Sequence, residues 1–369
     1  MSDSKIKVRP YHAEDKFALL QIVEQVYGHI VQKRYAMLWD WWQNRNCLAI
    51  EERYRPTVVQ REGVVVGFSG MQPRRFKIGS QELEGGFILD NFSSPEARGV
   101  GIALFRHLIE STELILGAPV SRANTLWKKL FGKDDIDVFH VRKGVRIIDP
   151  SAFLKVGKRT LLVHPIRWIW SCVEFTLGLL SPRIPGARLE SVERFPSAID
   201  ELCNRWASMQ TNSALRDQSY LNWRFSDSPI AYEKTLLWDG NTLAGFCVFR
   251  IGIMNGRRAL LLVEILAHHR NLRGAYGSLL AHAVKYAREH GATDVQTFDS
   301  GCSALRWSMQ RSGFFLKPES LALIGHFRHD KSDSCPIYKT QDWFISAGDS
   351  DFEFAYFNQG WESLEAVRV

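Results

Sequence analysis

The chain has 369 residues, of which 45% are hydrophobic and 24% are charged. This is the composition of a globular protein, so wholesale disorder is excluded, and the length suggests two domains or one large one. The formal net charge of +7 favours anionic partners such as a phosphate-bearing cofactor, nucleic acid or a membrane surface, and does not choose among them.

The first half alternates helix and strand signals. Apolar residues at helical spacing predict a helix, and runs of β-branched residues between turn signals predict strands. In chain order we expect a helix at 13–26, strands at 56–60, 63–70, 75–78 and 86–92, a helix at 102–110 and a buried strand at 113–116.

The second half repeats this order, with strands expected at 235–238, 243–251 and 259–267, a helix at 278–290 and a strand at 294–297. Val66-Gly67-Phe68 is matched by Ala244-Gly245-Phe246, and Trp41 precedes the first triplet as Trp223 precedes the second. The pattern predicts a duplicated α/β unit of about 150 residues, and the alternative is a chance similarity. We therefore expect domains at 1–150 and 191–369, the second with a C-terminal extension, and a linker at 151–190.

The linker is basic and rich in tryptophan. Residues 153–190 carry six Lys or Arg side chains against Glu174 and Glu190, and prolines bracket an apolar helix. This favours a linker helix packed across both domains. The alternative is an interfacial helix with Trp168, Trp170 and Phe175 in the headgroup zone, giving weak membrane-surface association through residues 166–180. That stretch is shorter than the roughly 20 residues that span a bilayer.

Six cysteines lie far apart without a Cys-x-x-Cys pair, which predicts buried, reduced thiols in a cytoplasmic protein. The charged N-terminus has no apolar segment after it, so no signal peptide is expected. No Cys/His spacing suggests a metal such as zinc, and the charge pattern gives no reason to expect nucleic acid as a partner.

The most informative segment leads from a strand ending near Ser93 into a helix, through Arg98, Gly99, Val100, Gly101, Ile102 and Ala103. The two glycines let the backbone approach a ligand, and the helix start presents its amides and the positive end of its dipole. This geometry holds a diphosphate, with Arg98 adding a charged contact. The alternative is a tight strand–helix connection. A P-loop would need Lys-Ser/Thr after the last glycine, and a dinucleotide fold would need its glycines in a first βαβ unit.

The segment resembles motif A of the GNAT acyltransferases, Gln/Arg-x-x-Gly-x-Gly/Ala, here Arg98-x-x-Gly101-x-Ala103 after Ser94-Pro95-Glu96. DQSYLNWRFSDSP (217–229) and WFISAGDSD (343–351) look like segments of bacterial tandem-GNAT proteins, some of which are associated with surface polysaccharide biosynthesis. The resemblance implies an α/β fold with a mixed (α+β) sheet in two tandem GNAT-like domains. It further implies that the loop cradles the pyrophosphate of acetyl-CoA and that an acetyl group passes to an amine of a small molecule or amino sugar.

Acyl transfer needs oxyanion stabilisation and a base. A β-bulge near the loop would aim backbone amides at the thioester carbonyl, and Phe92 and Ser93 are the positions expected for it. Asp90 is the candidate base, directly or through a water, although a strand-end carboxylate bonded to backbone amides is an equal alternative. Glu264 is the corresponding acid of the second half, and it would line the cleft or join a structural ion pair.

The second half departs from the motif. Asn271 replaces the leading Gln/Arg, and Tyr276 replaces the last small residue, where its ring would crowd the pyrophosphate path. We therefore expect only the first half to hold the cofactor. Many GNAT enzymes use a tyrosine as general acid, and its position falls on Trp127 in the first half and near Met309 in the second. Either the leaving group departs unassisted, or Tyr220 or a water supplies the proton.

Two rival functions remain. A peptidoglycan-type transferase would use aminoacyl-tRNA as donor and require no coenzyme A. A catalytically degenerate scaffold in polysaccharide assembly would bind coenzyme A without turnover.

The loop assignment predicts that Arg98→Glu weakens acetyl-CoA binding by at least ~1.4 kcal/mol, a tenfold change. The reason is that the reversed charge would face the pyrophosphate. Calorimetric titration of acetyl-CoA into both proteins measures the difference, and an unchanged dissociation constant would remove the loop from the mechanism.

Overall fold

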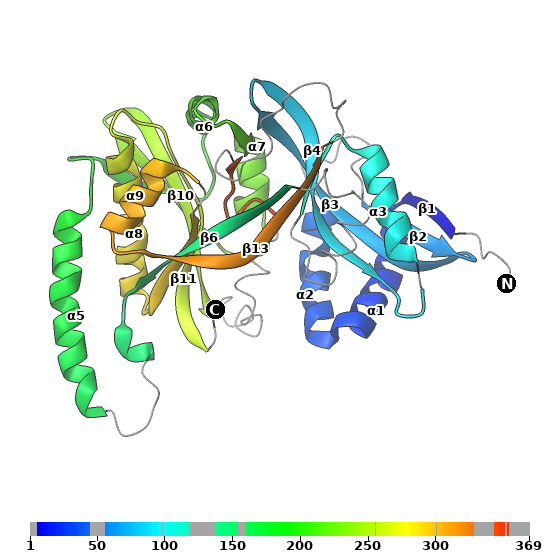
Figure 1. Cartoon of the computed structure of the whole chain (residues 1–369), viewed down its shortest axis with the longest axis horizontal. Helices are drawn as coiled ribbons and strands as arrows, with labels where there is room; N and C mark the ends of the chain where they lie inside the picture. Colours follow the sequence, from blue (N-terminus) through cyan, green and yellow to red (C-terminus); the bar gives the residue numbers. More distant parts are fainter. Residues whose placement is uncertain are drawn as a thin grey trace.

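The computed structural model describes residues 6–44, 56–97, 99–117, 137–153, 160–254, 256–299, 301–327, 343–350 and 353. Within these residues the chain forms one mixed sheet flanked by helices (Figure 1). The α/β class expected from the sequence is confirmed.

The first half supplies one end of the sheet and three helices. Its elements are β1 (Ile6–Pro10), α1 (Lys16–Tyr27), α2 (His29–Trp39), β2 (Thr57–Arg61), β3 (Val64–Ile78), β4 (Gln81–Ser93), α3 (Val100–Ser111), β5 (Leu114–Gly117) and β6 (Asp137–Ile147).

After α5 (Thr160–Leu180), the second half supplies the other end of the sheet. Its elements are β7 (Arg188–Ser191), α6 (Ala198–Ser208), β8 (Asn212–Ala214), α7 (Gln218–Leu221), β9 (Glu233–Asp239), β10 (Thr242–Met254), β11 (Arg257–Ala267), α8 (Leu272–Glu289), β12 (Asp294–Asp299), α9 (Ser303–Arg311), β13 (Phe315–Phe327) and β14 (Trp343–Phe344).

The two halves are built alike. Gly67 on β3 pairs with Ser93 at the end of β4, and Gly245 on β10 pairs with Ala267 at the end of β11. The internal similarity seen in the sequence therefore corresponds to equivalent positions in two strand pairs.

The tryptophans that precede these glycine-containing triplets meet at the junction of the halves. The rings of Trp41 and Trp223 are stacked with centroids 5.3 Å apart. Each indole donates to the other's carbonyl oxygen, at 2.8 Å from Trp41 and 3.3 Å from Trp223. This reciprocal contact is what a pseudo-two-fold relation between two copies of one unit requires.

The halves also exchange strands. The sheet order is β1-β2-β3-β4-β5-β13-β6-β12-β11-β10-β9-β7, with β8 beside β3 and β14 beside β8. β6 follows the first half in sequence but pairs with β12 of the second, and β13 follows the second half but pairs with β5 of the first. Figure 1 shows both long strands crossing between the halves. The expected boundary near residue 150 therefore divides the sequence, but strands from both sides of it belong to one sheet.

Strand alternation sends neighbouring side chains to opposite helical layers. On β2, Val58 packs in the core under α1 and α2, whereas Val59 packs under α3. On β11, Leu262 faces the core of α8, and Val263 faces the core that includes α6. β2 and β11 therefore bury side chains on both faces, which explains the consecutive apolar residues in their sequences.

Two expectations need correction. Residues 75–78 are the end of β3 rather than a separate strand, because β4 and β8 extend the pairing to Ile78. Cys172 is exposed rather than buried.

The helix of the expected linker, α5, contacts elements from both sides of the expected boundary. In the described contacts it lies against β6, and against α8 and Gly313.

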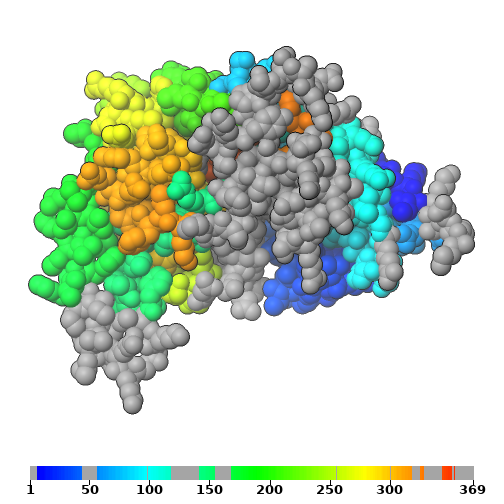
Figure 2. All heavy atoms as spheres, in the orientation of Figure 1, coloured from blue at the N-terminus to red at the C-terminus, as the bar shows by residue number. Residues whose placement is uncertain are grey.

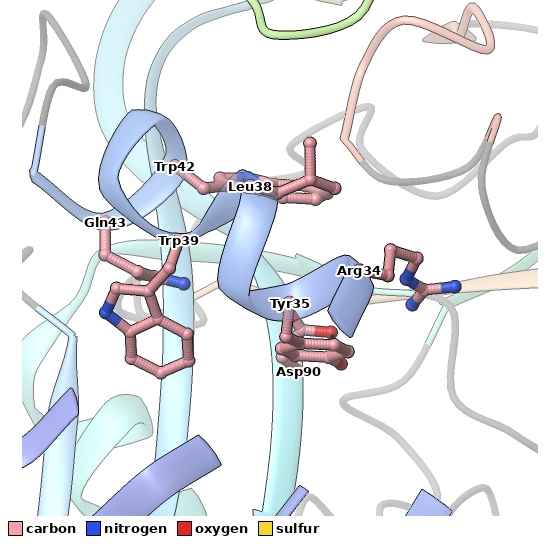
Figure 3. A pocket seen from close by; sticks show the side chains of 7 residues that line it. All are labelled: Arg34, Tyr35, Leu38, Trp39, Trp42, Gln43 and Asp90. Atoms are coloured by element: carbon pink, nitrogen blue, oxygen red, sulfur yellow. Dashed lines mark hydrogen bonds between the residues drawn. The ribbon is translucent and has the colours of Figure 1, made fainter. Parts of the chain in front are cut away.

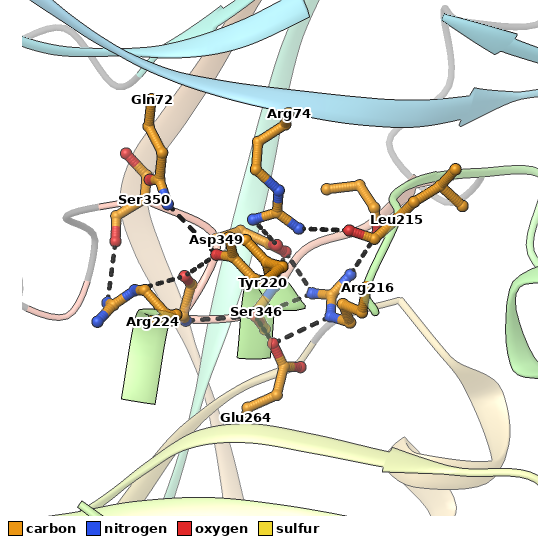
Figure 4. Close-up of polar contacts among 12 residues, drawn as sticks. Gln72, Arg74, Leu215, Arg216, Tyr220, Arg224, Glu264, Ser346, Asp349 and Ser350 are labelled. Carbon is orange, nitrogen blue, oxygen red and sulfur yellow. Dashed lines mark hydrogen bonds and ion pairs between the residues drawn. The ribbon is translucent and has the colours of Figure 1, made fainter. Parts of the chain in front are cut away.

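A buried ionic network ties the C-terminal segment to both halves (Figure 4). The guanidinium of Arg216 lies 3.1 Å from the Glu264 carboxylate and 2.7 Å from that of Asp349. Arg74 of β3 reaches Asp349 from the first half at 3.4 Å and stacks on the ring of Tyr220.

A second buried cluster surrounds Glu353. Its carboxylate pairs with Arg224, lies 2.9 Å from Arg250 and accepts the hydroxyl of Tyr232 at 2.6 Å. Burial alone would raise the pKa of Glu353, but the two arginines and the hydroxyl together lower it. The carboxylate therefore stays ionised inside the protein.

We expect Arg216→Met to lower the free energy of unfolding by about 3–5 kcal/mol, because it leaves the buried Glu264 without its cation and Asp349 with Arg74 alone, at 3.4 Å. Urea unfolding measures the change. Arg205→Met is the control, because Arg205 pairs with Glu201 on an exposed helix face at 3.3 Å and its loss should cost at most about 1 kcal/mol. Equal losses in the two variants would contradict the role assigned to the network.

Candidate functional site

The connection from β4 to α3 has the geometry of an anion site. Gly99 adopts the left-handed conformation, with φ +83°, and α3 begins at the next residue, Val100. A side chain at Gly99 would strain this turn, so the sequence requires glycine here. The turn aims the first amides of α3 away from the helix, where the helix dipole favours negative charge.

The amides of this turn divide into two groups. Those of Ile102 and Ala103 already donate to the Gly99 carbonyl oxygen, at 3.2 and 3.3 Å. Those of Gly99, Val100 and Gly101 have no backbone acceptor among the described residues.

The space in front of the turn is open. A Cβ built at Gly99 or Gly101 meets no atom within 4 Å in the described part of the chain. Phosphate oxygens would therefore find hydrogen-bond donors and enough space at this turn. Arg98 lies outside the described residues, so its expected contact with the phosphates stays a prediction.

The strand next to β4 on this side of the sheet is β5. Among the described residues, which on β5 end at Gly117, the two strands pair from Gly85 to Phe87, and β4 continues to Ser93. β4 therefore reaches towards the turn beyond the described part of β5.

The bulge of β4 lies at Asp90, not at Phe92 and Ser93 as expected. The pairing with β3 shifts between Ser69 and Gly70, which leaves Asp90 as the extra residue. Phe92 is buried in the core under α1 and α2, and Ser93 pairs regularly with Gly67. Asp90 has φ +49°, a left-handed conformation that few non-glycine residues other than Asn and Asp adopt.

Asp90 is held by the helix above it. The hydroxyl of Tyr35 on α2 donates to its carboxylate, and Arg34 contributes a positive charge nearby. Burial raises the pKa of Asp90, while the Tyr35 hydrogen bond and Arg34 lower it by less, so the net pKa is raised. A carboxylate with a raised pKa accepts a proton more readily than an exposed one.

The carboxylate lies in a pocket (Figure 3). Most of the lining residues are aromatic or apolar. Apart from Asp90, all of them come from α2 or from the turn after it: Arg34, Tyr35, Leu38, Trp39, Trp42 and Gln43. The buried Oε1 of Gln43 has no hydrogen-bond partner among the described residues. The cavity volume is about 10 Å³, room for about one water molecule or an ammonium group of similar size.

The corresponding turn of the second half is closed by its own sequence. The side-chain oxygen of Asn271 accepts the amide of Gly274 at 3.0 Å, and a Cβ at Gly274 would lie 2.4 Å from the Asn271 amide nitrogen. Gly101, at the equivalent motif position, faces open space instead. The expectation for Tyr276 was wrong, since its ring is fully buried in the core, with its hydroxyl 3.8 Å from the Cys302 sulfur.

Glu264, the other candidate catalytic residue, makes structural contacts. Glu264, three residues before Ala267 as Asp90 is before Ser93, is buried, pairs with Arg216 and accepts the Ser346 hydroxyl at 2.8 Å. Two roles were expected for Glu264, lining the cleft or joining a structural ion pair, and these contacts favour the ion pair.

Among the described residues, the positions considered for the general acid are also buried. The Tyr220 hydroxyl donates to the Gly348 carbonyl oxygen at 3.2 Å inside the buried network, and Met309 is buried in the core. Trp127 lies outside the described residues. Among the described residues no group of three His, Cys, Asp or Glu side chains is placed to hold a metal ion.

The pocket residues on α2 were missed in the sequence. Tyr35, Leu38, Trp39 and Trp42 recur at i, i+3, i+4 and i+7, a spacing that indicates a buried helix face. That spacing does not reveal which side chain meets Asp90, more than fifty residues away.

No protein-family model matches the sequence, and no curated protein matches it. Solved structures do match. A GCN5-related N-acetyltransferase from Anabaena variabilis is 15% identical with a TM-score of 0.59, and covers 87% of this chain and 72% of its own.

Two further structures agree. A probable N-acyltransferase from Enterococcus faecalis, itself of unknown function, is 12% identical, with a TM-score of 0.56 and coverage of 88% and 72%. A GCN5-related N-acetyltransferase from Kribbella flavida is 12% identical, with a TM-score of 0.58 and coverage of 88% and 71%. At these identities the likeness concerns the fold, and the chain has the GCN5-related N-acetyltransferase fold.

Proposed function

We propose that the chain is an acyltransferase that moves an acetyl group from acetyl-CoA to a primary amine of a small molecule or amino sugar, using the first half as its catalytic unit. The observation that carries this proposal is that the amides of Gly99, Val100 and Gly101 have no backbone acceptor among the described residues, at a turn where a Cβ at Gly99 or Gly101 would meet no described atom within 4 Å.

The donor fits this turn. Three amides and the helix dipole would hold the pyrophosphate, and Arg98 would add a charge from the sequence motif. The extended part of the donor would lie along β4 beyond Phe87. When bound, the donor supplies an acyl thioester, and the amides near the Asp90 bulge are the candidates to stabilise charge on the carbonyl oxygen.

The pocket fits an amine. Aromatic walls and a carboxylate attract an ammonium group, and the unpartnered Gln43 oxygen offers a second acceptor. An acceptor carboxylate or phosphate would find only Arg34 as a cation in this lining. The rest of the acceptor would extend outward from the mouth of the pocket.

Asp90 would take the proton that the ammonium must lose before it attacks. General-base catalysis of this kind contributes ~10²–10⁴-fold to a rate. Tyr35 would act through Asp90 as a positioning residue, because its hydroxyl fixes the carboxylate on the strained bulge.

The second half would serve as a degenerate copy. Its turn is capped by Asn271, so the amide of Gly274 is not available to a phosphate. Its part would be to complete the shared sheet through β6 and β13.

We expect Gly101→Ala to weaken acetyl-CoA binding at least ~10-fold while raising the free energy of unfolding by ~0.5–1 kcal/mol. The new methyl group meets no atom of the described residues within 4 Å, so we expect it to intrude on the ligand. Calorimetric titration and urea unfolding measure the two effects.

Gly178→Ala on α5 is the matched control, since its Cβ also meets no atom within 4 Å and it lies in a helix outside the site. It should stabilise the chain to a similar extent and leave acetyl-CoA binding unchanged. Full binding by Gly101→Ala would contradict the proposed donor site. Binding without thiol release over a panel of amines would favour a scaffold, and a requirement for aminoacyl-tRNA would favour the peptidoglycan-type transferase.

We expect Asp90→Asn to lower kcat/KM by ~10²–10⁴-fold and Tyr35→Phe to move the acidic limb of the pH–rate profile to higher pH. The sign follows from the pKa. The base works as a carboxylate, so the rate falls as pH falls through its raised pKa, and loss of the Tyr35 hydrogen bond removes an interaction that lowers that pKa. Thiol release from acetyl-CoA with primary amines, measured against pH, tests both variants.

Tyr27→Phe is the control, because the Tyr27 ring packs against the Phe92 ring on the same face, with centroids 6.5 Å apart. Its pH profile should match that of the wild type. A Tyr35→Phe profile that keeps its shape and loses only amplitude would show that the hydroxyl does not tune Asp90.

A further inference from the structure

α5 carries an apolar ridge, which we define as Trp168, Cys172, Phe175 and Leu179. The side chains of Trp168, Phe175 and Leu179 are 72%, 70% and 71% exposed, and Cys172 is exposed between them. Their i, i+4, i+7, i+11 spacing places them on one side of the helix. Contiguous exposed apolar surface of this kind marks a site for a partner or a membrane.

The opposite side of α5 is fixed to the protein. Glu174 pairs with Arg288 of α8 and lies 2.8 Å from the guanidinium of Arg146 on β6. Leu177 packs against the backbone at Gly313. The one acidic side chain on the described stretch 168–180 is therefore turned inward and neutralised, and the ridge is held facing outward.

A basic groove runs beside the ridge, between α5 and α8. Its cavity volume is about 400 Å³, and its charged lining residues are Arg146, Arg183, Lys285, Arg288 and Glu174. Four cations against one anion leave the groove strongly positive. Arg183 has no acidic partner among the described residues, and Lys285 has only Glu289, at 3.8 Å on the exposed face of α8.

The groove and the ridge adjoin. A neighbouring hollow of about 580 Å³ shares Glu174 and Arg288 with the basic groove and is lined by Phe175 of the ridge. In Figures 1 and 2, α5 forms the outer edge of the molecule next to α8 and α9. Apolar side chains and cations are thus presented together at an outer edge.

We propose that this face docks on a membrane that contains anionic phospholipid, with the ridge at the boundary between headgroups and acyl chains and the basic groove over lipid phosphates. A second copy of the chain fits less well, since a symmetric contact through this face would bring two positive grooves together. No helix of the described residues is long and apolar enough to cross a membrane, so α5 would lie on the surface.

Flotation of the full chain with vesicles tests the proposal, and it does not depend on the proposed function. We expect binding to vesicles of phosphatidylcholine mixed with phosphatidylglycerol, weaker binding to phosphatidylcholine alone, and a decrease at high salt. Phe175→Asp and Arg183→Glu should each weaken binding to the mixed vesicles at least ~10-fold.

Two control variants distinguish a specific role of this surface from the general effect of adding an acidic side chain to an exposed position. Phe17→Asp on α1 alters a residue that is 73% exposed, and Lys7→Glu on β1 makes the same charge change at an exposed site. Both should bind like the wild type. Equal losses in all four variants, or no vesicle binding at all, would overturn the proposal.

Two other outcomes would also overturn it. Self-association in sedimentation velocity that Phe175→Asp abolishes, without vesicle binding, would assign the ridge to a second copy. Stabilisation by inorganic phosphate in a thermal melt, without vesicle binding, would assign the groove to a free anion.

Discussion

The candidate site depends on one constraint, the bulge of β4 at Asp90. The pairing with β3 shifts there by one residue, and the bulge changes the course of β4 before the α3 turn. The same bulge places Asp90 under α2, where the Tyr35 hydroxyl meets its carboxylate. Donor and acceptor would therefore approach the same stretch of strand, from the turn and from the aromatic pocket respectively.

Duplication explains both the likeness and the difference of the halves. The two units keep the strand pairs anchored at Gly67 and Gly245, and Trp41 and Trp223 stack where the copies meet. Their turns differ at Asn271, whose side-chain oxygen accepts the amide of Gly274, whereas the amide of Gly101 has no backbone acceptor among the described residues. Strand exchange joins the two halves independently of these turns, because each half completes the sheet of the other.

The C-terminal segment is held by charge rather than by apolar packing alone. Each of its buried carboxylates meets two arginines, Asp349 meeting Arg216 and Arg74, and Glu353 meeting Arg224 and Arg250. Buried charges are tolerated where they are paired in this way. Such a network also fixes one arrangement of the halves, because the guanidinium of Arg74 reaches it from β3. On the outer side, α5 is fastened in the same way through Glu174.

The sequence by itself predicted most of strands β2 to β5 and β9 to β12, helices α1, α3 and α8, the duplication and the glycine turn near Gly101, because helix and strand periods and turn residues are local signals. It placed the bulge two residues too late and missed Tyr35, because pairing register and side-chain partners depend on which strands lie opposite. Only the tertiary structure decided that β6 and β13 exchange and that Glu264 is paired. Those outcomes depend on contacts between residues far apart in the chain, whose energies no local pattern encodes.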